Sequence, residues 1–122
     1  MGKRILIVDD DSKIASSIEF LLRREGHDVE VVTSASDAIE CVEEFWPALA
    51  FVATHLPDRD GYELCAALRA IPTEAPPHLV LVSPAVDDAV KARGSAAGAD
   101  DFVQYPLVTL ELLARVRPIL EK

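Results

Sequence analysis

Three consecutive aspartates, Asp9 to Asp11, follow a short apolar segment at residues 5–8 near the start of the chain. Adjacent carboxylates repel one another, so a run of three needs either exposure to water or a bound cation. Carboxylate oxygens suit Mg²⁺, which takes one or two protein carboxylates and keeps several waters. The alternative is structural: Asp11 or Ser12 caps a following helix while the other carboxylates are solvated. The run therefore predicts a cation-capable acidic pocket or a helix cap.

A second polar stretch follows the apolar segment 48–53. Its polar and turn-forming residues are His55, Pro57, Asp58, Asp60 and Gly61. The apolar segment itself ends in Ala53, whose methyl group offers neither a nucleophile nor a ligand. Another apolar segment, 79–82, leads directly to the hydroxyl of Ser83. The candidate functional groups are therefore the carboxylates of Asp9 to Asp11 and the hydroxyl of Ser83, whereas Ala53 contributes only a methyl group.

Several other chemistries lack their sequence motifs. No glycine-rich loop follows the first apolar segment, which argues against a dinucleotide site or a P-loop. Ser83 lacks the glycine pattern of a nucleophile elbow, which argues against a serine hydrolase. The three histidines are scattered and do not form a metal triad: His27, His55 and His78. The two cysteines, Cys41 and Cys65, are interpreted as reduced structural thiols within helices.

The composition is that of a globular protein, with 50% hydrophobic and 27% charged residues in a chain of 122. This length predicts a single domain, residues 1–122. The net charge of −9 would repel phosphates, so we expect neither a nucleic-acid partner nor a membrane partner. No signal peptide precedes the first apolar segment, and no apolar run approaches the ~18 residues of a membrane span. We therefore expect a cytoplasmic protein.

Strand-like and helix-like segments alternate five times along the chain. Short apolar runs rich in β-branched residues predict strands at 5–8, 29–32, 49–53, 79–82 and 102–105. Apolar residues at helical spacing predict helices at 14–22, 38–45, 62–68, 85–97 and 110–120. Gly94 weakens the fourth of these helices by about 1 kcal/mol relative to alanine. The alternation implies right-handed βαβ crossovers and an α/β fold with a helix-covered parallel sheet.

Ligands of open parallel sheets bind beyond the carboxyl ends of the strands. We therefore expect the functional residues to follow the strands directly. The residues in those places are Asp9 to Asp11, Ala53 to His55, Ser83 with Pro84, and Tyr105 with Pro106.

Four motifs with this order and spacing resemble those of the receiver domain of two-component response regulators, the CheY-like family. The motifs are ILIVDDDS, LPDRDGYEL, LVLVSP and GADDFVQYPL, and the resemblance covers essentially the whole chain. It implies a three-layer, doubly wound sheet of five parallel strands in the order 2-1-3-4-5, the flavodoxin-like arrangement. It also implies a role in phosphorelay signal transduction.

In that family, an aspartate at the end of the third strand accepts a phosphoryl group from a histidine kinase. An acid pair after the first strand helps to bind Mg²⁺, and a hydroxyl after the fourth strand contacts the phosphoryl oxygens. By resemblance, Asp9 and Asp10 are the acid pair and Ser83 is the hydroxyl. Pro106 matches the proline that follows a lysine through a cis bond, and Phe102 matches an aromatic switch position.

Two positions depart from the family pattern. Ala53 stands at the phosphoacceptor position, and Tyr105 stands at the lysine position. An alanine methyl cannot act as a nucleophile, so phosphorylation on the usual aspartate is not expected. We expect no required cofactor and at most weak Mg²⁺ binding by Asp9 and Asp10, helped by the backbone carbonyl of His55. We also expect Tyr105 to fill the space above Ala53 and its hydroxyl to partner Asp9 or Asp10.

The sequence therefore predicts a degenerate receiver that is not an enzyme and acts as a protein-interaction module. The expected partner is another signalling protein, an output domain or a second copy of the chain. The family's usual interface, around the fourth helix, fifth strand and fifth helix, includes Lys91, Arg93, Phe102, Leu107 and Arg115. Pro84 also departs from the family, which usually has a small non-proline residue there.

The alternative is a small Mg²⁺-dependent phosphatase of the haloacid-dehalogenase type. That family uses an Asp-x-Asp motif after the first strand, a hydroxyl after a later strand and a later acid pair. Asp9, Asp11, Ser83, Asp100 and Asp101 fit this pattern superficially. A lysine of that family is not evident in the chain.

Overall fold

The computed structural model of the protein describes residues 2–106 and 109–121. Its strands are β1 (Arg4–Val8), β2 (Asp28–Val32), β3 (Leu49–Ala53), β4 (His78–Ser83) and β5 (Asp101–Gln104). Its helices are α1 (Ser12–Arg24), α2 (Ala35–Phe45), α3 (Gly61–Arg69), α4 (Asp88–Ala97) and α5 (Thr109–Leu120). Leu107, which the resemblance assigned to the family's usual interface, lies outside the described residues.

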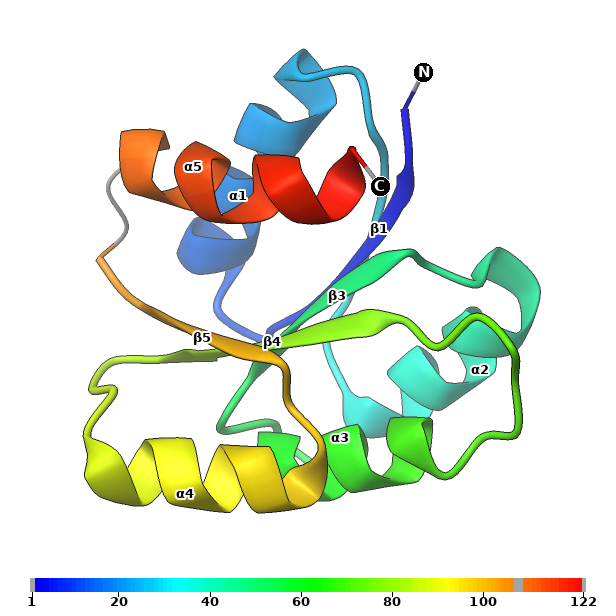
Figure 1. Cartoon of the computed structure of the whole chain (residues 1–122), viewed down its shortest axis with the longest axis vertical. Helices are drawn as coiled ribbons and strands as arrows, with labels where there is room; N and C mark the ends of the chain where they lie inside the picture. The colour runs from blue at the N-terminus through cyan, green and yellow to red at the C-terminus, as the bar shows by residue number, and fades with distance from the viewer. Residues whose placement is uncertain (1, 107–108, 122) are drawn as a thin grey trace.

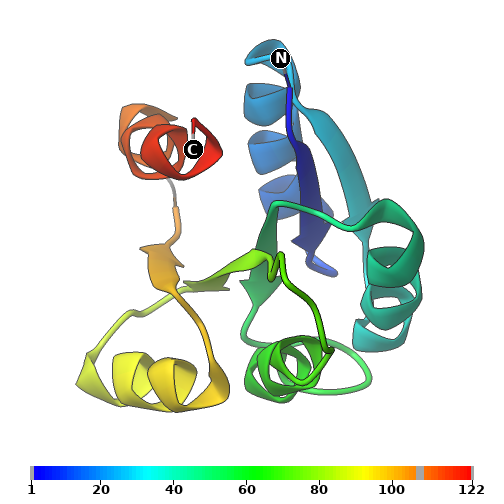
Figure 2. The same ribbon diagram turned by 45° about the vertical axis from the view of Figure 1, so that its right-hand side comes forward.

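The strands form one sheet in the order β2-β1-β3-β4-β5, and every neighbouring pair is parallel. Both the α/β class and the 2-1-3-4-5 order predicted from the sequence are confirmed. Helices α1 and α5 cover one face of the sheet, and α2, α3 and α4 cover the other (Figure 1). A second view separates the same three layers (Figure 2).

Each face of the sheet carries its own apolar cluster, because successive residues of a strand point to opposite faces. Phe51 packs towards α1 and α5, whereas its neighbours Ala50 and Val52 pack towards α2 and α3. All five residues of β3 are buried. This two-sided burial explains why the central strands are continuous apolar runs rather than alternating patterns.

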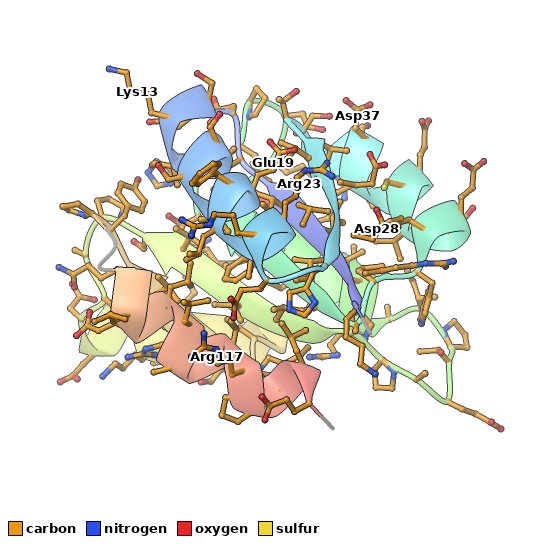
Figure 3. The ribbon with its side chains drawn as sticks, turned by 90° about the horizontal axis from the view of Figure 1, so that it is seen from above. Lys13, Glu19, Arg23, Asp28, Asp37 and Arg117 are labelled. Atoms are coloured by element: carbon orange, nitrogen blue, oxygen red, sulfur yellow. The ribbon has the colours of Figure 1, made fainter. Side chains whose placement is uncertain are left out.

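The side of the fold with α1 and α5 is held together by charged pairs as well as by apolar contacts. Arg117 of α5 donates to Glu25, the C-cap residue of α1, at 2.8 and 3.0 Å. Figure 3 shows α1 and α5 side by side above the sheet. The Arg23–Glu19 pair, at 3.0 Å, lies one turn apart within α1. Only the Arg117–Glu25 pair joins the two helices, and exposed pairs of this kind contribute about 0–1 kcal/mol each.

Four helices begin at a polar side chain that caps their free backbone N–H groups. The capping residues are Asp11 for α1, Ser34 for α2, Asp60 for α3 and Asp87 for α4. The predicted start of the fourth helix at residue 85 was wrong, because Asp87 accepts from Val90 N at 2.9 Å and helix geometry begins only after it. The predicted end of the fifth strand was one residue too late, since Tyr105 follows the strand.

Both cysteines are free thiols, Cys65 fully buried and Cys41 half-buried. In the ranges 2–106 and 109–121, no helix is both long enough and apolar enough to cross a membrane.

Candidate functional site

The carboxyl ends of β1, β3 and β4 lie next to one another, as the parallel register requires. Val8 pairs with Val52, and Ala53 pairs with Val82. Asp9, which follows β1, therefore lies at the level of Ala53, and Ser83 lies one residue beyond. The structure brings these three predicted positions to one edge of the sheet.

Asp9 is the buried carboxylate of this edge, with only 5% of its surface exposed. Its Oδ1 accepts from the backbone N–H of Asp11 at 2.9 Å. Burial raises the pKa of Asp9, the Asp11 N–H lowers it, and the nearby charges of Asp10 and Asp11 raise it further. The net direction is upward, so this carboxyl group holds its proton more tightly than a free aspartate does.

The remaining two aspartates of the run have different surroundings. Asp10 is exposed to solvent. Asp11 caps α1 by accepting from Lys13 N at 3.0 Å and Ile14 N at 3.3 Å. The prediction that one aspartate of the run caps the following helix is therefore confirmed for Asp11.

Among the residues that the structure describes, no group of three or more His, Cys, Asp or Glu side chains could hold a metal ion. Asp9 and Asp10 supply two carboxylates, and β3 ends in an alanine instead of a third. The side chain of His55 is exposed. The donor set is thus a poor fit for tightly bound Mg²⁺, which is held through several oxygen ligands in a fixed geometry.

Ser83 is buried at the end of β4, and its hydroxyl is turned towards the loop that follows. Its Oγ donates to the carbonyl of Ala85 at 2.9 Å and accepts from Ala85 N at 3.4 Å. Gln104 fixes the next residue of the same loop, because its Oε1 accepts from Val86 N at 3.2 Å. The hydroxyl proton of Ser83 is therefore engaged in holding the β4–α4 loop.

Tyr105 precedes Pro106 through a cis peptide bond, and its half-buried side chain packs against the apolar cluster on the α1 and α5 face of the sheet. The two residues line a cavity of about 280 Å³ with Lys13, Ile14 and Ser17 of α1. Lys13 itself points away from the body of the protein (Figure 3). Burial raises the pKa of Tyr105, and the charges of the acid run raise it further.

Across residues 2–106 and 109–121, the Tyr105 hydroxyl makes no hydrogen bond to Asp9 or Asp10. The expected partner for this hydroxyl was therefore wrong. The ring packs instead against the apolar cluster on the α1 and α5 face of the sheet, which suits the apolar body of a tyrosine.

Phe102 lies half-buried on β5, beneath α4. A Cβ atom added to Gly94 would lie 2.3 Å from Cε1 of the Phe102 ring and 2.7 Å from Cδ1 of Leu81. Arg115 of α5 donates to the Phe102 carbonyl at 2.7 Å and to Asp101 at 3.0 Å. The glycine that seemed only to weaken α4 is the residue that lets the helix approach the sheet.

The loop between β3 and α3 holds contacts that the sequence analysis missed. Asp58 accepts from Ala35 N and Ser36 N, at 2.9 Å each, and so caps α2 from outside that helix. Asp60 caps α3 and also pairs with Arg93 of α4. An Asp followed three residues later by Glu63 is a recognisable capping signal for α3. No local signal could reveal the Asp58 contact, since its partners are 22 and 23 residues away.

The acid pair needed by the phosphatase alternative lies elsewhere. Asp101 begins β5, at the amino end of the parallel strands, whereas Asp9 follows the carboxyl end of β1. Asp100 is engaged by Arg69 and by Leu79 N. These two carboxylates therefore cannot share a site with Asp9 and Ser83.

Five parallel strands in the order 2-1-3-4-5, with polar residues gathered beyond their carboxyl ends, define a flavodoxin-like α/β protein. Residues 5–117 match the response regulator receiver domain family, and the chain belongs to that family. Receiver domains act in two-component signalling, where they contact other signalling proteins or output domains, and they are generally not enzymes.

Solved structures agree with this assignment. The chain is similar to a beryllofluoride-activated DrrB receiver domain, with 30% identity, a TM-score of 0.88 and 100% of both chains covered. It resembles a signal receiver domain from Bermanella marisrubri, with 32% identity, a TM-score of 0.85 and 98% of both chains covered. A CheY-like receiver protein from Methanospirillum hungatei is 29% identical, with a TM-score of 0.89 and coverage of 99% of this chain and 95% of that one.

Proposed function

We propose that this receiver domain signals without phosphorylation of an aspartate and acts as a protein-interaction module. The observation that supports this most directly is Ala53, a residue with 6% of its surface exposed at the end of β3. By resemblance to the family, this is the phosphoacceptor position. Phosphoryl transfer needs an oxygen nucleophile in line with phosphorus, and a methyl group has none.

The neighbouring hydroxyl groups are poor substitutes. Thr54 follows Ala53 and therefore points to the opposite side of the chain. Its backbone is fixed, since its N–H donates to Val82 at 3.1 Å and its carbonyl accepts from Gly61 N at 2.8 Å. The Ser83 hydroxyl is engaged by Ala85. Neither group is free to attack a phosphoryl donor beside Asp9.

The second substitution supports the same proposal. In the family, the aspartate and the lysine form a charged pair, and removal of one member strands the other at roughly 3–5 kcal/mol if buried. Ala53 and Tyr105 are both uncharged at neutral pH, so no charge is stranded. The two residues are thus consistent with a site that has settled into an unphosphorylated arrangement.

No cofactor is required in this proposal, and Mg²⁺ is at most weakly held by Asp9 and Asp10 with the backbone carbonyl of His55. If bound, the ion would supply charge neutralisation of the acid run. Backbone N–H groups already offset part of the negative charge of the acid run. Asp9 accepts from the Asp11 N–H, and Asp11 accepts from the first N–H groups of α1.

The surface proposed for recognition consists of α4, β5 and α5. Lys91, Arg93 and Arg115 are exposed there. The partner is another signalling protein, an output domain or a second copy of the chain, and its recognition depends on shape and charge. The charges there are mixed, because Arg93 pairs with Asp60 and Arg115 pairs with Asp101, so a partner would meet an alternation of charges and not a field of one sign.

Intact-mass measurement after incubation with acetyl phosphate and Mg²⁺ tests the proposal. We expect no species heavier by about 80 Da, the mass of one phosphoryl group. The double variant Ala53→Asp/Tyr105→Lys is the matched control, and it is expected to gain that species. A phosphorylated form of the natural chain would overturn the proposal.

A phosphatase assay with p-nitrophenyl phosphate and Mg²⁺ addresses the enzyme alternative. We expect no turnover by the natural chain. Turnover that Asp9→Asn abolishes would establish the alternative instead.

A further inference from the structure

Helix α4 has little apolar anchorage of its own. Gly94 is its only buried residue, so the helix contributes no large side chain to the core. Its neighbour α3 is a residue shorter but buries five residues. A ten-residue helix is not stable in isolation, so α4 depends on specific contacts with the rest of the fold.

Arg93 makes side-chain contacts that join α4 to the start of α3. Its Nη2 donates to Asp60 Oδ2 at 2.9 Å. Its guanidinium also lies over the ring of Tyr62, 4.2 Å from the ring centre. Asp60 and Tyr62 belong to the N-terminal turn of α3, which lies beside α4 (Figures 1 and 2).

The contact has two components with different physical character. The Arg93 and Asp60 side chains are 62% and 29% exposed, so salt screens their attraction. The stacking of Arg93 on Tyr62 depends on a planar guanidinium and a mostly buried ring. Lysine would retain the charge but lose the planar stacking surface.

The ends of α4 are fixed differently. Asp87 caps the first turn. At the other end Gly98 adopts a positive φ of 100°, and its carbonyl accepts from Arg69 at 3.0 Å. Between these two ends, and among the residues that the structure describes, Arg93–Asp60 is the ion pair that connects α4 to the start of α3. Arg93 is followed in the chain by Gly94, at which α4 comes close to Phe102.

We propose that Arg93 is a latch that holds α4 against α3 through Asp60 and Tyr62, and that release of this latch lets α4 open as a local unit. Opening uncovers the Tyr62 ring and the outer side of Phe102. The latch thereby sets how rigidly the α4 surface is presented to a partner. The inference concerns the motion of α4 and holds whether or not the domain is phosphorylated.

Hydrogen exchange of the α4 backbone amides, measured on the full chain by mass spectrometry or NMR, tests the latch. Arg93→Gln removes both components, and we expect α4 exchange to accelerate about tenfold while the strand amides stay unchanged. Arg93→Lys retains the charge, so a smaller acceleration is expected. Asp60→Asn keeps a side chain that can cap α3 and removes only the ion pair, so its effect should also be smaller.

Lys91→Gln is the matched control, because it removes one positive charge from the same helix while leaving the Arg93 contact in place. We expect α4 exchange in this variant to equal that of the natural chain. Equal rates of α4 amide exchange in Arg93→Gln and Lys91→Gln would overturn the proposal that Arg93 holds α4 in place. So would an acceleration spread evenly over all helices and strands, since it would show that Arg93 supports the whole fold and not α4.

Discussion

Asp58, in the loop after β3, caps a helix that begins at Ala35, because its Oδ1 accepts from Ala35 N at 2.9 Å. Its second carboxylate oxygen accepts from Ser36 N. The same loop supplies Asp60, which caps α3 and engages α4. A loop at the edge of the candidate site therefore connects three helices on one face of the sheet.

Replacing Asp58 should loosen the first turn of α2. The Ala35 and Ser36 N–H groups hold the pKa of Asp58 below its usual range, so the ionised form is the stabilising one. We expect Asp58→Ala to accelerate hydrogen exchange at these two amides, and Asp58→Asn to have a smaller effect. Asp37→Asn removes a charge from the same helix end and should leave them protected.

The Asp58 contribution should also depend on pH. Because its folded-state pKa is lowered, the stabilisation is present above the unfolded value of about 3.9 and is lost as pH falls through the folded value. We expect the difference in urea midpoint between the natural chain and Asp58→Asn to be constant near neutrality and to vanish in strong acid. A difference that grows on acidification would contradict this assignment.

Gly61 should not tolerate a side chain. A Cβ at this position would lie 2.0 Å from the Ala53 carbonyl oxygen, so the backbone of the loop would have to move. We expect Gly61→Ala to lower the free energy of unfolding by about 3 kcal/mol, at the upper end of typical overpacking costs. Gly26→Ala is the comparison, with a φ of 90° but open space around it, and should cost about 1 kcal/mol. Urea denaturation measures both losses of unfolding free energy. A smaller loss for Gly61→Ala than for Gly26→Ala would show that the loop adapts to the added methyl group.

Asp9→Asn should stabilise the domain near neutral pH. Burial raises the folded-state pKa of Asp9, so its ionised form is less favourable in the folded chain than in the unfolded chain. At low pH, Asp9 is protonated in both the folded and the unfolded chain, and its carboxyl group then costs no folding stability. The cost appears as pH rises above the unfolded pKa of about 3.9, and it grows until pH exceeds the folded pKa. We expect the gain in melting temperature to be largest at pH 7 and to shrink towards pH 4. A loss at pH 7 would show that the Asp9 charge itself is stabilising.

The two cysteines should differ in reactivity. Burial raises the pKa of Cys65 to about 12, so only about one molecule in 10⁵ carries the thiolate at pH 7. Burial and the charges of Glu30 and Glu44 also raise the pKa of Cys41, but that side chain is half-buried. We expect iodoacetamide to label Cys41 slowly and Cys65 only after unfolding, as peptide mass mapping would show. Rapid labelling of Cys65 in the folded chain would mean that α3 opens readily.

Local sequence patterns predicted most of the elements. The run from Ile5 to Val8 and the run from Leu49 to Ala53 are buried on both faces, and that environment selects continuous apolar segments. The start of α4 was missed because Ala85 and Val86 resemble helix residues, whereas the Asp87 side chain fixes the boundary. Strand order came from the resemblance, since pairing between distant segments is not a local property.

The amino-acid sequence alone specifies which groups the strand ends offer: carboxylates at Asp9 and Asp10, a hydroxyl at Ser83, a methyl group at Ala53 and a phenol at Tyr105. The partners of these and other side chains follow from the folded chain: Ser83 donates to Ala85, Asp58 caps α2 and Arg93 lies on Tyr62. The reactivity of a side chain follows from its covalent structure, whereas its partner depends on the path of the backbone through the whole fold.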